Sequence, residues 1–482
     1  MNDLDLLRAT ALIDGAAVEG GAAIPRLSPV DEEPLGVLST SDATIVGQAL
    51  ESAQRAQRGW ARRSSIERGM VLRKWAAALS AERQRLARLL SREIGKPILE
   101  AYGEIDFAAA TLQYSAEFDR RLDGVLLQPE RRDEQMWIAP EPVGVVAAII
   151  TWNAPIALAM RKLAPALIAG NAVVLKPHEL ASFAVLDVVR LGLGSGIPKG
   201  VVNVVVGPGA PAGVALVSSP IPGLVTFTGG RNAGKAIAAQ AAEHLPALSL
   251  EMGGKAPFLI LDDCNLDEAA AATVAAKIRN CGQTCVANER VLVHRSVAAE
   301  FLQRLTDRFA ALKVGDPLER AVQVGPKVSK AELARIEGLV DRARAAGGQV
   351  VCGGSRLRGG AFDRGYWYAP TLLTGVTARM EIMQEEIFGP VLPVMEVESF
   401  DEALAVANDS PYGLAACVFT SDVRRVMRAL RELECGEVYV NRPPGESVHG
   451  FHSGWKQSGV GGDDGMLGLR HYLRHKTVYL RA

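Results

Sequence analysis

The chain has 482 residues, of which 48% are hydrophobic, and its 53 lysines and arginines nearly balance 54 aspartates and glutamates, for a net charge of −1 at pH 7. This balance gives no electrostatic basis for binding nucleic acid or an anionic membrane, so small molecules and further copies of the chain are the expected partners. The length exceeds what one hydrophobic core supports and predicts two or three domains.

The cysteines predict free thiols in a reducing compartment and no metal site, because their spacing fits neither a disulfide scaffold nor a C-x-x-C metal site. Near the N-terminus, Asp3, Asp5 and Arg8 interrupt any apolar core of a signal peptide. No run approaches the ~20 apolar residues of a membrane span. These features predict a soluble, cytoplasmic protein. The six cysteines stand at positions 264, 281, 285, 352, 417 and 435.

The N-terminal part predicts short strands followed by helices. Residues 9 to 40 contain several turn signals between short apolar runs. Asp42 is a suitable helix N-cap, and Ser64 with Glu67 has the spacing of a capping box. Hydrophobic residues then recur at a helical period until Gly95 ends the pattern. The predicted helices cover residues 43 to 60, 70 to 79, the segment that ends at Ile94, and 98 to 122.

From residue 144, apolar runs alternate with helical stretches, which is typical of a parallel sheet covered on both faces. Ligands bind such sheets at the carboxyl ends of the strands, so the residues after each run matter most. Polar residues and glycines end strands in many proteins, but five such ends in succession favour a shared ligand site. No G-x-G-x-x-G follows a strand, so the usual dinucleotide fingerprint is missing. The runs are 144 to 150, 172 to 175, 201 to 206, 224 to 227 and 258 to 261.

Cys285 lies in the small, polar stretch I-R-N-C-G-Q-T-C-V-A-N-E-R at 278 to 290. Gly282 and its polar neighbours predict a loop between a helix at 267 to 278 and a strand at 290 to 294. A thiol on such a loop is accessible and is a candidate nucleophile, although a free cysteine more often packs as a small hydrophobe. The sequence places no histidine to pair with it, which weakens the hypothesis of a cysteine hydrolase.

The second half, about 255 to 440, repeats an α/β pattern and contains the stretch Q-E-E-I-F-G-P-V at 384 to 391. The tail from residue 450 is glycine-rich and then strand-like at 476 to 480. A strand at the end of a chain can complete the sheet of another copy, so this tail is consistent with an exchanged edge strand in an oligomer.

Six motifs, in this order, resemble the aldehyde dehydrogenase superfamily over essentially the whole chain: T-W-N-A-P, K-P-H-E, F-T-G-G, E-M-G-G-K, N-C-G-Q-T-C and E-E-I-F-G-P. The resemblance implies an α/β fold whose variant Rossmann cofactor domain lacks G-x-G-x-x-G, with a catalytic α/β domain and a small β oligomerisation element. A homodimer or homotetramer is expected. The implied boundaries are 1–122 and 144–254 for the NAD-binding domain, 255–440 for the catalytic domain, and 123–143 with 455–482 for the oligomerisation strands.

The resemblance also implies catalytic roles. Cys285 matches the nucleophile, which attacks the aldehyde to give a thiohemiacetal and, after hydride loss, a thioester. Glu251 matches the general base that activates water to hydrolyse this thioester. Asn153 matches the side-chain donor that stabilises the oxyanion together with the Cys285 backbone N–H. Lys162 matches a lysine that lies behind the base.

For the cofactor, Lys176 and Glu179 match the pair that holds the adenine-side ribose. An acidic residue there suits free ribose hydroxyls and favours NAD over NADP, whereas His178 could help to bind a phosphate. Glu386 and Phe388 match residues at the nicotinamide ribose and ring. The remaining expected cofactor contacts are Ile150, Thr151, Trp152, Asn153, Gly209, Gly213, Phe227, Gly229, Gly230, Met252 and Arg335.

The C-terminal stretch G-F-H-S-G-W-K-Q-S-G-V-G-G at 450 to 462 is similar to the lactaldehyde and glycolaldehyde dehydrogenase branch. That similarity implies that Arg161, Glu446 and His452 contact the hydroxyl-bearing end of the substrate. Arg161 could instead form a salt bridge on a helix surface, and His452 could be a satisfied loop histidine. Val286 stands where the branch has asparagine directly after the nucleophile, which predicts a less polar pocket and makes a larger semialdehyde or an aromatic aldehyde the alternative to a small hydroxyaldehyde such as lactaldehyde or glycolaldehyde.

Two further functions are compatible with the same motifs. A CoA-acylating relative would share the thioester, but Glu251 as a water-activating base counts against it. A catalytically silent NAD-binding protein would keep the fold without turnover.

Cys281, four residues before the nucleophile, has two possible roles. It either packs in the interior or forms a protective disulfide with Cys285.

Overall fold

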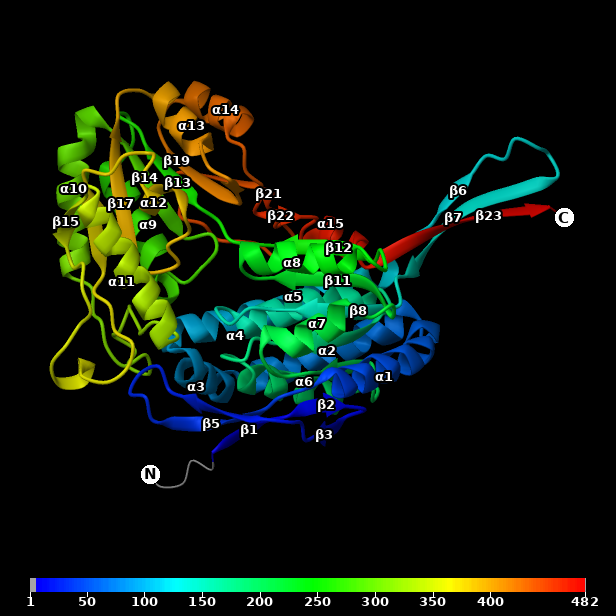
Figure 1. The fold of residues 1–482 in the computed structure, drawn as a ribbon. Helices are drawn as coiled ribbons and strands as arrows, with labels where there is room; N and C mark the ends of the chain where they lie inside the picture. Colours follow the sequence, from blue (N-terminus) through cyan, green and yellow to red (C-terminus); the bar gives the residue numbers. More distant parts are fainter. Residues whose placement is uncertain (1–5, 482) are drawn as a thin grey trace.

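The computed structural model describes residues 6–481, and its largest element is an eight-stranded sheet of order β22-β12-β11-β8-β9-β10-β2-β3 (Figure 1). Of its parallel strands, the central β8 comes first in the chain; β9 and β10 then follow on one side, and β11 and β12 on the other. This reversal between β8 and β11 opens a crevice at the carboxyl ends of the strands. The parallel strands are β8 (Val145–Ile149), β9 (Ala172–Lys176), β10 (Val202–Val204), β11 (Pro222–Thr228) and β12 (Ala247–Glu251).

Short antiparallel strands close both edges of this sheet. On one edge lie β2 (Ala11–Ile13) and β3 (Ala16–Val18), and on the other lies β22 (Gly459–Val460). All positions of β8 and β9 are buried, because helices cover both faces. The apolar runs are therefore continuous rather than alternating. A separate N-terminal sheet contains β1 (Leu7–Ala9), β5 (Pro34–Ser39) and β4 (Ala23–Leu27).

Two helical layers cover the first sheet. The buried residues of α1, α7 and α8 pack on one face, and those of α2 to α6 pack on the other. The predicted N-cap Asp42 and the capping box of Ser64 and Glu67 are both present. The predicted helix at 98 to 122 ends earlier, since a 3₁₀ turn, η1 (Glu117–Arg120), follows it. The helices are α1 (Ala43–Arg62), α2 (Ser65–Ala81), α3 (Arg83–Ile94), α4 (Ile98–Ala116), α5 (Pro155–Ile168), α6 (Phe183–Gly194), α7 (Val214–Val217) and α8 (Arg231–Ala241).

The second α/β unit contains a seven-stranded sheet of order β15-β16-β17-β14-β13-β19-β20, in which only the edge strand β15 runs antiparallel to its neighbour. Its strands are β13 (Ala256–Ile260), β14 (Asn288–His294), β15 (Gln349–Cys352), β16 (Thr371–Thr374), β17 (Val391–Val397), β19 (Ala415–Phe419) and β20 (Glu437–Val440). Helices α9 (Leu266–Ile278) and α10 (Arg295–Ala310) cover one face. The other face packs against α11 (Lys330–Ala345), α12 (Glu381–Gln384), α13 (Phe400–Asn408) and α14 (Val423–Glu432).

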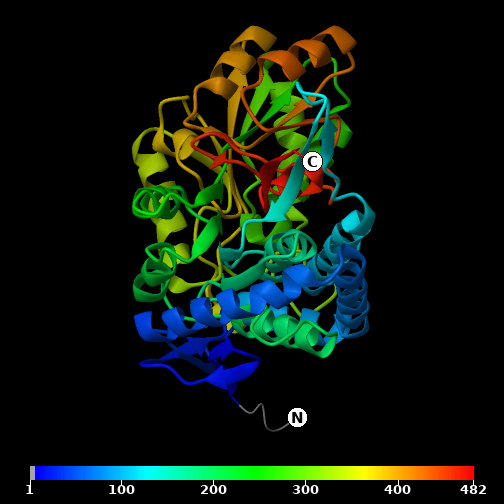
Figure 2. The same cartoon turned by 90° about the vertical axis from the view of Figure 1, so that its right-hand side faces the viewer.

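A three-stranded antiparallel arm projects from the body and carries the C-terminus at its tip (Figure 1). It contains β6 (Val125–Leu127), β7 (Glu134–Pro142) and β23 (Leu473–Arg481), and β23 pairs with β7 along its whole length. In the view turned by 90° this arm points toward the viewer and lies in front of the body (Figure 2).

The rest of the C-terminal segment returns to the body. β21 (Trp455–Lys456) pairs with β18 (Tyr412–Gly413), β22 pairs with β12, and the helix α15 (Gly465–Arg470) leads into β23. Within the predicted oligomerisation range 455–482, only β23 therefore belongs to the arm. The use of this arm in an oligomer stays a prediction. Between residues 6 and 481, no helix combines the length and the apolar character that crossing a membrane requires.

Candidate active site

The carboxyl ends of the first sheet and the Cys285 loop face a shared cavity of about 1170 Å³. Most of the residues that the sequence predicts as site residues line it. Lys162 and Gly213 do not: Lys162 is fully buried beside the cavity, and Gly213 ends a short π-helical turn, η2 (Gly209–Gly213). The predicted residues that line the cavity are Ile150, Thr151, Trp152, Asn153, Arg161, Lys176, His178, Glu179, Gly209, Phe227, Gly229, Gly230, Glu251, Met252, Cys285, Val286, Arg335, Glu386, Phe388, Glu446 and His452.

The loop before Cys285 is held in an unusual backbone conformation. Asn280 and Cys281 have φ angles of 49° and 58°, in the left-handed region that residues other than glycine seldom adopt. Glu100 on α4 accepts the N–H of Asn280 at 2.7 Å, and the Gln283 side chain bridges from the Asn280 carbonyl to the N–H of Val328. Such strain persists only where the surroundings over-determine it, and here they fix the segment that leads to the half-buried Cys285.

Asn153 follows β8 and directs its amide toward the same loop. Its side-chain Nδ2 donates to the backbone carbonyl of Gln283 at 3.0 Å, and its backbone carbonyl accepts from Asn280 Nδ2 at 3.0 Å. An amide nitrogen carries two N–H bonds, so one remains for a ligand in the cavity. This placement suits a donor beside the thiol.

Glu251 ends β12 with a carboxylate that is 2% exposed. Among the described residues, neither of its oxygens has a hydrogen-bond partner. Burial raises the pKa of Glu251 to about 8, although the nearby charge of His452 lowers it in part. A carboxyl group with a pKa in this range can accept and release a proton near neutral pH. Behind it, Lys162 pairs with Asp463 at 2.5 Å, and the charge of Lys162 lowers the pKa of Glu251 while that of Asp463 raises it.

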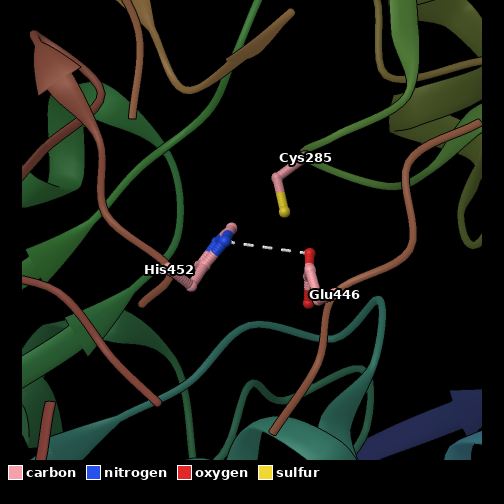
Figure 3. Close-up of side chains that lie close together, drawn as sticks. All are labelled: Cys285, Glu446 and His452. Carbon is pink, nitrogen blue, oxygen red and sulfur yellow. Dashed lines mark ion pairs between the residues drawn. The ribbon is translucent and has the colours of Figure 1, made fainter. Parts of the chain in front are cut away.

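Cys285, Glu446 and His452 converge on one point of the cavity (Figure 3). One possible ligand atom from each side chain lies within 4.8 Å of the other two. Among residues 6–481, these three side chains are close enough together to hold a metal ion. The expectation that no histidine pairs with Cys285 is therefore corrected. His452 comes from a glycine-rich turn far along the chain, which is why its proximity to the thiol is invisible in the sequence.

Carboxylates surround His452. Its Nδ1 lies 3.1 Å from Glu437 Oε1 and 3.8 Å from Glu446 Oε1, and its Nε2 lies 3.8 Å from Glu251 Oε2. Burial disfavours the charged ring. The negative charge of Glu446 and the hydrogen bonds to Cys285 and to Glu437 nevertheless raise the pKa of His452 well above its ordinary value. His452 is 3% exposed and hydrogen-bonds to Glu437, as a satisfied histidine would, and its contact with the substrate stays a prediction. A protonated imidazole next to the thiol can donate to an oxygen of a bound substrate.

Arg161 on α5 completes this end of the cavity. Its Nη2 lies 2.6 Å from Glu446 Oε2 and 2.7 Å from Asp464 Oδ2, and only 5% of the residue is exposed. The hypothesis of a surface salt bridge is therefore wrong. Asp463, Asp464 and Glu437 were not predicted, although the run G-G-D-D-G at 461 to 465 is a signal: two acidic residues in a glycine-rich turn often serve a site.

The opposite end of the cavity fits the adenosine half of a dinucleotide. Lys176 Nζ donates to the Gly207 carbonyl at 2.7 Å, and burial lowers its pKa to about 8. The Nδ1 of His178 accepts the N–H of Leu180 at 3.1 Å, and burial lowers its pKa to about 4, so this ring is neutral at pH 7. Helix α8 begins after Gly230 without a side-chain cap, which leaves backbone N–H groups for a pyrophosphate.

Glu386 and Phe388 shape the wall between this end and Cys285. Glu386 Oε1 accepts the N–H of Gly254 at 3.1 Å, and a Cβ at Gly253 would displace this carboxylate. The Phe388 ring meets Trp152 edge-on at 5.4 Å. Arg335 donates to the carbonyls of Glu386 and Ile387 at 3.2 and 2.7 Å, so it braces the backbone of this wall.

Comparison with known proteins agrees with this arrangement. The family model "Aldehyde dehydrogenase family" matches residues 17–478. A 3,6-anhydro-α-L-galactose dehydrogenase from Vibrio sp. (strain EJY3) is 42% identical over 97% of this chain and 98% of its own. The lactaldehyde dehydrogenase of Escherichia coli (strain K12) is 38% identical over 98% of both chains. A solved 3,6-anhydro-L-galactose dehydrogenase in complex with NAP superposes with a TM-score of 0.97 at 42% identity, covering 98% of this chain and 100% of that one.

The chain belongs to the aldehyde dehydrogenase family. The resemblance and the fold class predicted from the six motifs are thus confirmed. The protein is an oxidoreductase of this family, and its fold is the aldehyde dehydrogenase fold.

Proposed function

We propose that the protein oxidises a hydroxylated aldehyde to its carboxylate, with NAD as the acceptor. The observation that carries the substrate class is the polar cluster of Arg161, Glu446 and His452 against Cys285. A hydroxyl group next to the aldehyde carbon would find a carboxylate acceptor and an imidazolium donor there. Lactaldehyde, for which one relative is named, is such an aldehyde, and so is glycolaldehyde.

The chemistry assigns one task to each residue. When bound, NAD supplies the acceptor for the aldehyde hydride. Cys285 adds to the carbonyl carbon, and the Asn153 amide donates to the oxygen that becomes negative. After oxidation, the acyl group is held as a thioester on Cys285. Glu251 then takes a proton from water, whose oxygen attacks the thioester and releases the carboxylate and the thiol.

The preference for NAD rests on the charges at the ribose site. Glu179 lies at this end of the cavity, where its carboxylate suits two hydroxyls and repels a 2′-phosphate. His178 is neutral at pH 7 and adds no positive charge for a phosphate. Lys176 and Arg26 are the cations that act on Glu179, and NADP is the alternative cofactor.

A less polar substrate is the second candidate. Val286 directly follows the nucleophile, is 3% exposed and lines the cavity with Phe107 and Ile278. These apolar side chains would suit a larger semialdehyde or an aromatic aldehyde. The mechanism would be unchanged.

We further propose that the protein is a cytoplasmic homodimer or homotetramer. The arm supports this assembly because it exposes large side chains, with Leu126 at 81% and Tyr479 at 70% exposure. Exposed apolar residues on a projecting strand are typical of an interface between copies. All six cysteines are free thiols, which fits a reducing compartment.

The substrate class is tested by comparing kcat/KM for lactaldehyde and propanal, which differ by one hydroxyl group, together with glycolaldehyde, benzaldehyde and succinic semialdehyde. Lactaldehyde should exceed propanal by about tenfold or more, because leaving buried polar groups unpaired is costly. In Glu446→Gln this ratio should fall toward one. Propanal or benzaldehyde as the best substrate of the unmodified protein would support the second candidate instead.

A further inference from the structure

A buried carboxylate links the nucleophile loop to the wall of the nicotinamide end. Glu289 lies at the start of β14, four positions after Cys285, and is 1% exposed. It does not line the cavity. Its Oε2 accepts the N–H of Ile387 at 2.5 Å, and its Oε1 accepts the N–H of Phe388 at 3.3 Å. Glu289 thus holds the backbone that presents Glu386 and Phe388.

Two buried lysines keep Glu289 ionised. Lys255 Nζ lies 3.2 Å from Oε2, and Lys277 Nζ lies 2.9 Å from Oε1 and 3.0 Å from the Asn288 carbonyl. Burial alone would raise the pKa of Glu289, but Lys277 and Lys255 lower it below its ordinary value. A buried charge is costly unless it is paired and hydrogen-bonded, and this carboxylate has two ammonium groups and two backbone N–H donors.

Cations hold the same segment from its carbonyl side. Lys327 Nζ donates to the Phe388 carbonyl, and Arg335 donates to the carbonyls of Glu386 and Ile387. Phe388 has a φ of 50°, which is strained for an aromatic residue. The strained conformation requires strong fixation on both sides, and Glu289 provides it on the N–H side.

We propose that Glu289 is a positioning residue that fixes the segment 386–388 for the nicotinamide half of the cofactor. The proposal rests on the proposed function, which places Glu386 and Phe388 at the nicotinamide ribose and ring. Because Glu289 and Cys285 lie on one short stretch of chain, the same carboxylate sets the distance between the thiol and this wall. The adenosine end, with Lys176 and Glu179, lies outside its reach.

The test compares equilibrium binding of NAD and of ADP, which lacks the nicotinamide half, to the unmodified protein and to Glu289→Gln. NAD should bind about tenfold more weakly to the variant, as expected when hydrogen bonds to a charged group are lost, whereas the affinity for ADP should be unchanged. No aldehyde is present, so an error in the proposed substrate cannot affect the result. If neither nucleotide bound the unmodified protein, the proposed function would fail instead.

Two further variants separate positioning from a general loss of structure. Glu289→Gln leaves two lysines unpaired, so the double variant Glu289→Gln/Lys277→Met restores the net charge of the buried group and should show the same selective loss of NAD affinity. Asp263→Asn is the matched control, because Asp263 accepts the backbone N–H groups of Ser421 and Asp422 in the same domain, away from the cavity. Equal losses for NAD and ADP, or unchanged NAD affinity in the folded double variant, would overturn the proposal.

Discussion

His452 Nε2 lies 3.8 Å from Glu251 Oε2, and both side chains are almost completely buried beside Cys285. The Glu251 carboxylate, which we propose as the general base, and the His452 imidazole are therefore electrostatically coupled. Burial raises the pKa of Glu251 to about 8, and the positive charge of His452 prevents a still larger rise. The pH dependence of thioester hydrolysis should report this contact directly.

Activity should rise with pH until about pH 8, because Glu251 must be deprotonated to take a proton from water. At pH 7, one unit below this pKa, only about a tenth of Glu251 is ionised. In His452→Gln the neighbouring positive charge is lost, so the pKa of Glu251 should rise and the ascending limb should move to higher pH. The measurement is kcat against pH for both proteins. A profile that is flat through pH 8, or a limb that moves to lower pH in the variant, would contradict the assignment.

Glu179→Gln should make NADP a better cofactor relative to NAD, because it removes the charge that repels a 2′-phosphate. We expect the ratio of kcat/KM with NADP to that with NAD to rise by about tenfold, since one unit of charge at short range contributes roughly 1 kcal/mol or more. Glu243→Gln is the control, because Glu243 is exposed and lies outside the cavity. An unchanged ratio would show that Glu179 does not discriminate between a ribose hydroxyl and a 2′-phosphate.

Cys281 should act through packing rather than through a disulfide. The side chain is 1% exposed, and burial raises the pKa of its thiol to about 12, so almost no reactive thiolate forms near neutral pH. Cys281→Ala should keep its activity and lose ~1 kcal/mol of unfolding free energy, measured by urea denaturation. Peptide mapping after mild oxidation should find no bond between Cys281 and Cys285. Detection of that disulfide would favour the protective role instead.

The sequence predicts elements and local chemistry well where one short stretch carries the signal. The apolar runs locate β8, β9, β11 and β13, because strands buried on both faces must be continuously apolar. The polar, glycine-containing stretch around Cys285 indicates a loop, and the structure has η3 (Arg279–Gly282) and irregular chain there. The order of the strands in the two sheets is a long-range property that these runs do not contain.

Long-range pairs account for what the sequence does not predict. Arg161 meets Asp464, and Lys162 meets Asp463, across about 300 residues of chain. The sequence around each of these residues gives no indication of its partner. Glu289 illustrates the same limit. From the sequence, a carboxylate at the start of an apolar strand is expected at the surface, but in the structure it is buried and paired with Lys255 and Lys277. Such pairs form only when helices, strands and loops pack together in the folded chain.

The central claim is that Cys285 carries the acyl group as a thioester, and acid-quenched mass spectrometry of Glu251→Gln mixed with NAD and lactaldehyde tests it most directly. Without the base, hydrolysis should slow by about a hundredfold or more, so the acyl group should accumulate. We expect the added mass of one lactoyl group on the peptide that contains Cys285, and none in Glu251→Gln/Cys285→Ala. NADH formation without any adduct on Cys285, or an adduct on another residue, would contradict it.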